Sequence, residues 1–209
     1  MQPVQELTGH RHAEEVSRRL FMTGVGAAAG GTMVASSLAA SNALAEKAPS
    51  QVNIGPNDVP IPLRINGTVR TVVAPPSTTL VDALRGPLDL TGTKIGCDRG
   101  ACSACTVWLD GAPIASCMIL AIDVGGRAVT TIEGLADGDK LHPVQAAFIE
   151  HDAVQCGFCT PGMVMSCAAL LARNPHPSLD DVKAATSGHL CRCGTYPHVF
   201  AATLAAAKT

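Results

Sequence analysis

The sequence predicts an α+β fold in which a small domain of strands, residues 61–134, is followed by an all-α domain, residues 135–209. Hydrophobic side chains alternate with polar ones in the first region and recur at helical spacing in the second. All nine cysteines lie between Cys97 and Cys193. The cysteine chemistry is therefore shared between these two domains and absent from the first part of the chain.

The composition excludes two broad classes of protein. The 15 Lys and Arg residues are nearly balanced by 17 Asp and Glu, giving a formal charge of −2, whereas a nucleic-acid-binding domain usually carries a basic stripe. A hydrophobic content of 47% argues against a disordered chain. Because aromatic residues make up only 3%, the core must consist mainly of Ala, Val, Leu and Ile.

The first 45 residues have the features of an export signal. An arginine pair lies within residues 17–22 (SRRLFM), and no charged residue follows until Glu46. The segment ends in Ala43-Leu44-Ala45, a small-x-small cleavage sequence. We expect a twin-arginine signal cleaved after Ala45, export of the folded protein to the periplasm, and no membrane span in the mature chain. An uncleaved membrane anchor is the alternative, which the many Gly and Ser residues disfavour. Residues 46–60, rich in Pro and Asn, are expected to form a linker.

The strand domain is expected to begin with a hairpin and a short helix. Hydrophobic residues alternate on both sides of Asn66-Gly67, the preferred pair for a type I′ turn. Thr79 and Asp82 then form a capping-box pattern at the start of a helix over residues 80–85. These elements resemble the opening of a ubiquitin-like roll.

A second hairpin and a fifth strand complete this predicted domain. Residues 106–109 and 113–118 flank an Asp110-Gly111 turn, and residues 127–132 form a further apolar run. Five strands packed on one helix would bury a single core.

Four short helices are expected after residue 135. Pro143 suits the first turn of one helix, and Thr160-Pro161 opens a second that runs to about Arg173. Ser178 and Asp181 form the capping box of a third helix, and the fourth runs over about residues 197–207. Four helices in this length predict a bundle.

Four cysteines of the strand domain have a distinctive spacing. They follow the pattern C-x4-C-x2-C with a fourth cysteine further along, which resembles the ligand pattern of plant-type [2Fe–2S] ferredoxins. Gly96 and Gly100 would let the loop turn tightly and present backbone N–H groups to the sulfurs. The expected ligands are Cys97, Cys102, Cys105 and Cys117.

Four further cysteines lie in the helical domain. One pair precedes the second helix and the other lies between the third and fourth helices, so antiparallel helices would bring both pairs to the same end of the bundle. The expected ligands of this second site are Cys156, Cys159, Cys191 and Cys193. Cys167 is left over within an apolar helix, where a buried, inert thiol is expected.

Other uses of these cysteines are possible. Zinc also takes four thiolates, and CxxC pairs are common at zinc sites. Disulfides are favoured in an exported protein, although a chain assembled around a metal before export would already have its thiols occupied. A Rieske centre would need histidine ligands, but four cysteines suffice without His189.

Three segments carry a resemblance to a known family: residues 96–111 (GCDRGACSACTVWLDG), 155–163 (QCGFCTPGM) and 187–196 (SGHLCRCGTY). They resemble the signatures of the iron–sulfur subunit of molybdenum hydroxylases, the xanthine dehydrogenase and aldehyde oxidoreductase family. With the export signal, the chain is most similar to the subunits of bacterial periplasmic aldehyde oxidoreductases. The resemblance implies a β-grasp, plant-type ferredoxin-like domain followed by a four-helix-bundle domain, each holding one [2Fe–2S] cluster.

The resemblance also implies a role for the chain. A large partner subunit with a molybdopterin cofactor would oxidise an aldehyde or hydroxylate an N-heterocycle. Its electrons would pass singly through the helical-domain cluster and then the ferredoxin-domain cluster to an FAD-binding medium subunit or a haem-bearing cytochrome c. Gln155 and Cys193 match positions that contact the pterin in relatives. The chain itself would hold no catalytic residue for the substrate.

Two positions depart from the family pattern. Ser103 replaces a usual glycine, and His189 stands where asparagine is frequent, where it could hydrogen-bond near the second cluster. Neither change removes a ligand. A free-standing ferredoxin-like electron carrier and a zinc or disulfide scaffold without redox activity remain alternative functions.

Overall fold

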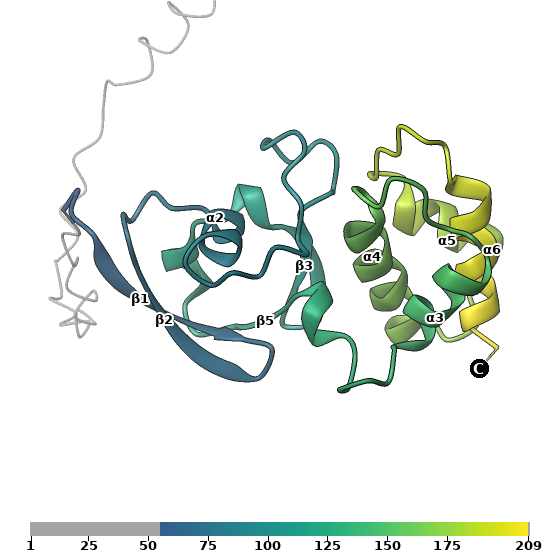
Figure 1. The fold of residues 1–209 in the computed structure, drawn as a ribbon, viewed down its shortest axis with the longest axis horizontal. Helices are drawn as coiled ribbons and strands as arrows, with labels where there is room; N and C mark the ends of the chain where they lie inside the picture. Colours follow the sequence, from purple (N-terminus) through teal and green to yellow (C-terminus); the bar gives the residue numbers. More distant parts are fainter. Residues whose placement is uncertain (1–54, 209) are drawn as a thin grey trace, which may run out of the picture. The chain divides into compact units, whose positions relative to one another are not determined.

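A five-stranded mixed sheet forms the first domain of the computed structural model, which describes residues 55–208 (Figure 1). The expected export signal, its cleavage site and most of the expected linker lie outside the described residues. The strand order is β2-β1-β5-β3-β4. The strands are β1 (Val59–Ile65), β2 (Thr68–Ala74), β3 (Thr106–Leu109), β4 (Ala112–Ala115) and β5 (Ala128–Thr130).

The first hairpin has the predicted turn. Asn66 and Gly67 both have positive φ angles, 49° and 81°, as a type I′ turn requires, and Ile65 pairs with Thr68 across it. The expected interpretation of Asn66-Gly67 is confirmed. β1 also pairs in parallel with β5, so the hairpin is joined to the strand that ends the domain.

Helix α2 (Leu80–Arg85) covers the buried face of the sheet. The Asp82 N–H donates to the Thr79 hydroxyl at 3.2 Å, which confirms the expected N-cap. Leu80 and Leu84 are fully buried against sheet residues such as Leu63. The resulting core is almost entirely aliphatic, in keeping with the few aromatic residues of the sequence.

The second hairpin is shorter than expected. β4 ends at Ala115, and residues 116–118 form a 3₁₀ turn, η1 (Ser116–Met118). The Ser116 N–H and hydroxyl both donate to the Cys105 carbonyl, at 3.3 and 2.7 Å, and these bonds replace the strand ladder. The prediction that a strand runs through residue 118 was therefore wrong, and Cys117 lies in a turn. β5 is likewise shorter than residues 127–132.

Four helices form the second domain, as predicted. They are α3 (Pro143–Glu150), α4 (Thr160–Arg173), α5 (Leu179–Thr186) and α6 (Tyr196–Ala206). The Ser178–Asp181 capping box of α5 is present. Phe148, Met163 and Val199 pack in a core shared by α3, α4 and α6. Cys167 is fully buried in this core, and burial raises its pKa to about 11, as expected for an inert thiol.

Helix α4 packs against β3, so the two domains share a contact within residues 55–208 (Figure 1). The Trp108 indole N–H donates to the Met165 carbonyl at 2.8 Å. Gly162 allows a close approach, since a Cβ there would overlap the Ser103 carbonyl oxygen. The contact therefore places the start of α4 directly against the loop that precedes β3.

None of the helices within residues 55–208 combines the length and the hydropathy needed to cross a membrane.

Candidate iron–sulfur sites

The first cysteine set gathers where the loop between α2 and β3 meets the turn η1. Cys97 and Cys102 lie in the loop, Cys105 directly precedes β3, and Cys117 lies in η1. The thiol of Cys97 interacts with that of Cys102, and the thiol of Cys105 with that of Cys117. The structure thus brings these four predicted residues together, since Cys117 is also close enough to Cys97 to be affected by its charge. A [2Fe–2S] cluster bound by four cysteines needs two thiolates for each iron.

Backbone N–H groups of the same loop point at the sulfurs. The Ala101 N–H donates to Cys97 Sγ at 3.2 Å, and the Gly100 N–H donates to Cys117 Sγ at 3.3 Å. Gly100 has a φ of +71°, which permits the tight turn that aims these groups inward. A Cβ on Gly96 would lie 3.0 Å from Cys102 Sγ, so glycine also leaves room beside the sulfur. Such donors stabilise a negatively charged cluster.

The environment of these thiols differs from one to the next. A hydrogen bond from the Arg99 backbone N–H lowers the pKa of Cys97 to about 7. Burial raises the pKa of Cys117 to about 11. A coordinated metal deprotonates its thiol ligands outright, so Cys117 can serve as a thiolate once iron is present.

The second cysteine set lies at one end of the helical bundle. Cys156 and Cys159 precede α4, while Cys191 and Cys193 lie between α5 and α6. Cys156 interacts with Cys193, and Cys159 with Cys191, so each pair joins the two loops. The expectation that antiparallel helices bring both connections to the same end is confirmed.

The second set is more open to solvent than the first. Cys156 is exposed, whereas Cys159 is buried and burial raises its pKa to about 12. Burial raises the pKa of Cys191, but hydrogen bonds from Thr195, Cys159 and Gly194 together outweigh it and lower the value to about 7. The Thr195 hydroxyl lies 3.2 Å from Cys191 Sγ. Gln155, which precedes Cys156, is exposed as well.

The first cysteine set carries the inward N–H donors that stabilise the sulfurs of an iron–sulfur cluster. All nine cysteines are free thiols, so the structure contains no disulfide framework among them. Paired thiols with inward N–H donors fit a [2Fe–2S] cluster.

A backbone hydrogen bond joins the two sites. The Leu190 N–H donates to the Cys102 carbonyl at 3.2 Å. Leu190 is bonded directly to Cys191, so the route between the two cysteines is covalent except for this one bond. Sequence reasoning missed this contact, because the two residues lie far apart along the chain and carry no local signal of it.

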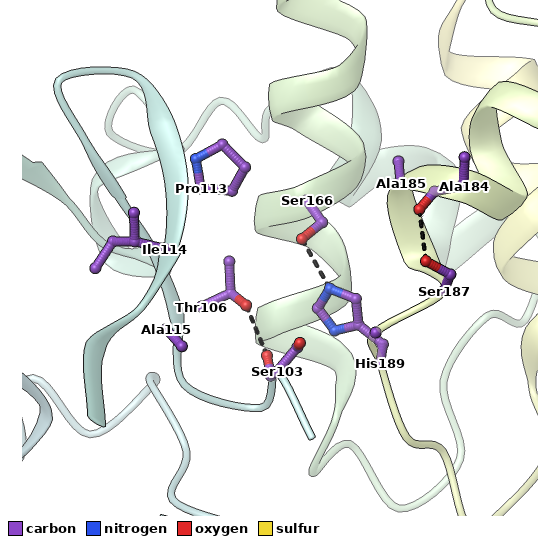
Figure 2. A pocket seen from close by; sticks show the side chains of 11 residues that line it. Ser103, Thr106, Pro113, Ile114, Ala115, Ser166, Ala184, Ala185, Ser187 and His189 are labelled. Atoms are coloured by element: carbon purple, nitrogen blue, oxygen red, sulfur yellow. Dashed lines mark hydrogen bonds between the residues drawn. The ribbon is translucent and has the colours of Figure 1, made fainter. Parts of the chain in front are cut away.

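His189 lies in a pocket of about 210 Å³ between the two domains (Figure 2). Its side chain is only 3% exposed, and Nε2 lies 2.7 Å from the Ser166 hydroxyl. Burial lowers its pKa to about 4, so the ring is neutral at pH 7. Ser103, the other departure from the family pattern, lines the same pocket and has a φ of +56°. His189 therefore contacts α4 rather than extending the sulfur ligand set.

Two families of iron–sulfur domains match this chain. Residues 63–124 match the family described as "2Fe-2S iron-sulfur cluster binding domain", and residues 131–204 match "[2Fe-2S] binding domain". These matches cover both domains of the structure and both cysteine sets. The chain is a protein with two [2Fe–2S] clusters, one in each domain.

Individual relatives narrow the assignment. The nicotine 6-hydroxylase small subunit of Paenarthrobacter nicotinovorans is 47% identical over 150 residues, covering 71% of this chain and 90% of the relative. The aldehyde oxidoreductase iron-sulfur-binding subunit PaoA of Escherichia coli K12 is 41% identical over 162 residues, covering 70% of this chain and 71% of the relative. Quinoline 2-oxidoreductase of Pseudomonas putida 86 superposes with a TM-score of 0.70 at 45% identity, covering 73% of this chain and 95% of that one.

The chain belongs to the family of iron–sulfur small subunits of molybdenum hydroxylases. The expected β-grasp ferredoxin-like domain and helical [2Fe–2S] domain are confirmed by the matches and the structural neighbours. In the aldehyde oxidoreductase of Desulfovibrio desulfuricans, the similar region is 17% of a longer chain, with a TM-score of 0.67 and 44% identity.

Proposed function

We propose that this chain carries single electrons from a partner's molybdenum site through its two clusters to an acceptor. The observation that carries the proposal is the presence of two separate sets of four thiols, whose loops meet through the Leu190–Cys102 hydrogen bond. Each bound [2Fe–2S] cluster supplies a one-electron redox couple. The proposed ligands are Cys97, Cys102, Cys105 and Cys117 in the first domain, and Cys156, Cys159, Cys191 and Cys193 in the second.

The protein's own contribution is position and environment. The contact between α4 and β3 fixes the distance between the cysteine loops, with Trp108 and Gly162 holding the domains together. Backbone N–H groups stabilise negative charge on the sulfurs of the first site. The largely buried ligands of that site limit access of water. An electron relay needs these features and no substrate pocket.

The helical domain is proposed to face the large molybdopterin-binding subunit. Gln155 and Cys193, the two residues expected to contact the pterin, lie beside the exposed Cys156. Next to this loop is an apolar groove of about 310 Å³, whose lining includes the exposed side chains of Leu141, Ile149 and Val154. Exposed apolar surface continuous with an electron-entry site is suited to burial against a partner subunit.

This docking can be tested with a matched pair of variants. Ile149 in the groove and Val69 on β2 are each 66% exposed, but Val69 lies on the other domain. In the co-expressed complex, Ile149→Asp should weaken co-purification with the large subunit, because a charge would be buried at the interface. Val69→Asp should leave co-purification unchanged. Equal behaviour of the two variants would contradict the proposed orientation.

The reaction and the final acceptor are proposed by class. Relatives carry names such as aldehyde oxidoreductase, nicotinate dehydrogenase and caffeine dehydrogenase, so the complex is proposed to act on aldehydes first and N-heterocycles second. Electrons would leave the ferredoxin-like domain for an FAD-binding medium subunit or a cytochrome c. Mass spectrometry of the complex purified from its host would identify the partners. Substrate-dependent reduction of the clusters would identify the reaction.

We also propose that the chain is exported to the periplasm by the twin-arginine route and cleaved after Ala45. The arginine pair, the uncharged stretch and the small-x-small sequence support this. Replacing both Arg18 and Arg19 by Lys should retain the chain in the cytoplasm with residues 1–45 still attached. N-terminal sequencing of the mature periplasmic form checks the cleavage site.

Spectroscopy of the purified complex tests the relay itself. Visible absorption that dithionite bleaches, two distinct electron paramagnetic resonance signals, and equal amounts of iron and acid-labile sulfide are expected. Zinc in place of iron, or iron without labile sulfide, would overturn the proposal. Transfer of electrons from one free protein to another by the chain alone, with no large subunit bound, would instead favour an independent carrier.

A further inference from the structure

One hydroxyl group holds the backbone on both sides of Leu190. The Tyr196 hydroxyl donates to the His189 carbonyl at 2.8 Å and accepts from the Cys191 N–H, also at 2.8 Å. Tyr196 is the first residue of α6, so its side chain ties the start of this helix to the cysteine loop. The hydroxyl uses both its donor and its acceptor capacity on this loop.

The geometry of the peptide bond gives this contact its consequence. The His189 carbonyl and the Leu190 N–H belong to the same planar trans peptide unit, so they point in opposite directions. Holding the carbonyl toward Tyr196 therefore turns the N–H away from it. On that opposite side the N–H donates to the Cys102 carbonyl at 3.2 Å. The two hydrogen bonds fix one peptide plane between the two cluster-bearing domains.

Side-chain packing does not supply this orientation at Leu190 itself. The Leu190 side chain is 63% exposed and lies outside the buried cores. His189 is fixed separately, by its side chain on Ser166 and by its N–H on the Thr186 carbonyl at 2.9 Å. These bonds hold the Cα of His189 but leave the rotation of the next peptide unit free. The Tyr196 hydroxyl restricts that rotation.

The Tyr196 ring is anchored independently of its hydroxyl. It packs against the core of the helical domain, and its centroid lies 6.4 Å from that of Phe200. Phenylalanine at this position would keep the ring contacts while losing both hydrogen bonds. The role of the hydroxyl can therefore be separated from the role of the ring.

We propose that Tyr196 is a positioning residue for electron transfer between the two clusters, acting by orienting the 189–190 peptide so that Leu190 bonds to Cys102. This inference rests on the proposed relay function. It adds a named group that controls the step between the clusters, distinct from the ligands that bind them. The Tyr196 hydroxyl contacts backbone groups of the loop and no cysteine sulfur.

The test uses Tyr196→Phe in the co-expressed complex. Iron content and both paramagnetic signals should be unchanged. Hydrogen exchange of the Leu190 amide should rise about tenfold, because the bonds that orient its peptide are gone. The rate of electron transfer between the clusters, followed by rapid-freeze paramagnetic resonance, should fall several-fold.

Thr195→Val provides the matched control. It removes the hydroxyl that lies 3.2 Å from Cys191 Sγ but leaves the 189–190 peptide untouched. The midpoint potential of the helical-domain cluster should shift, while Leu190 amide exchange stays at the wild-type rate. A similar change in Leu190 exchange in both variants would show general loosening of the loop and would overturn the proposal.

The remaining outcomes are also decisive. Unchanged Leu190 exchange and unchanged transfer in Tyr196→Phe would overturn the positioning role while leaving the relay intact. If that variant fails to hold its clusters, exchange of the Leu190 amide in the wild-type complex still tests the proposal. The Leu190 amide must exchange slowly there despite its exposed side chain, and rapid exchange would refute the proposal. Absence of both clusters in the wild type would instead refute the relay itself.

Discussion

The two cysteine sites offer the same number of thiols on different scaffolds. In the ferredoxin-like domain, three cysteines come from one loop and the fourth from η1, and Cys102, Cys105 and Cys117 are each less than a tenth exposed. In the helical domain, two loops contribute two cysteines each, and Cys156 is exposed. The first site is thus largely enclosed, with only Cys97 partly exposed, whereas the second leaves Cys156 open to solvent.

This difference in exposure bears on how the potential of each cluster is set. Solvent exposure and hydrogen bonds to the sulfurs are among the factors that set the potential of an iron–sulfur cluster. In the enclosed site, burial and the N–H donors of its own loop supply most of these factors. The open site depends on whatever covers Cys156 and Gln155, so a partner subunit would complete it. Both the accessibility and the potential of the second cluster should therefore respond to assembly.

The largest expected effect is the separate loss of each cluster. Cys105→Ser should remove the cluster of the ferredoxin-like domain, and Cys159→Ser that of the helical domain, because each replaces a buried thiol of the proposed ligand set. Each variant should lose about half of the iron and one of the two paramagnetic signals, given four ligands per cluster. Cys167→Ser, about two turns along α4 from Cys159, should keep both signals. Loss of both clusters in either ligand variant would mean that the sites are not independent.

Removal of metal by a chelator should distinguish the two sites by the rate at which each loses its cluster. When the isolated chain is treated with a chelator, the helical-domain cluster should be lost first, because Cys156 is exposed. In the complex with the large subunit, the two clusters should be lost at more similar rates. The decay of each paramagnetic signal with time measures this. Equal loss in the isolated chain would contradict the view that the second site is the open one.

A smaller effect is expected at Ser103, in the loop of the enclosed site. Its φ of +56° is in the left-handed region, which is costly for residues other than glycine. Ser103→Gly should therefore stabilise the domain by about 1 kcal/mol, seen as a higher midpoint of thermal unfolding with both clusters bound. Ser187→Gly, at an exposed position of the same pocket, is the comparison variant and should give no such gain.

The smallest expected effect concerns pH at the start of α3. His142 Nδ1 accepts the Val144 N–H at 3.2 Å, and burial lowers the pKa of His142. Since the folded pKa is below the unfolded one, the stabilisation is present above about pH 6.5 and is lost as pH falls toward the folded value. The loss should be at most about 1 kcal/mol, a typical value for a helix cap.

Exchange of the Val144 amide, corrected for its intrinsic pH dependence, measures this opening. Protection should decrease between pH 7.5 and pH 5 in the wild type. His142→Asn keeps a capping acceptor that does not titrate, so its protection should stay constant over the same range. A pH dependence that persists in the asparagine variant would assign the effect to another group.

Local signals predicted most of the elements and the grouping of the cysteines. Asn66-Gly67, the Thr79 cap and the Ser178 capping box act within a few residues, so the sequence alone specifies them. The end of β4 was missed because Ser116 bonds to the Cys105 carbonyl, a contact between separate elements. A turn that depends on a distant carbonyl has no signature in its own residues.

The contacts between the domains could not be predicted from the sequence either. The Trp108–Met165 and Leu190–Cys102 bonds each use a backbone carbonyl, which every residue possesses, so no residue type marks the partner. Tyr196 ends the family-like segment 187–196, but its bonds to two backbone groups could be seen only in three dimensions. The burial of His189 comes from its contact with Ser166 of α4, which is remote along the chain.

Gly162 allows α4 to approach the loop before β3 more closely than any residue with a side chain would allow. Any side chain at this point of α4 would meet the Ser103 carbonyl and act as a spacer between the helix and the loop. In the proposed relay the electron crosses between these two domains, so Gly162→Ala would widen the separation of the helix from the loop and slow the transfer.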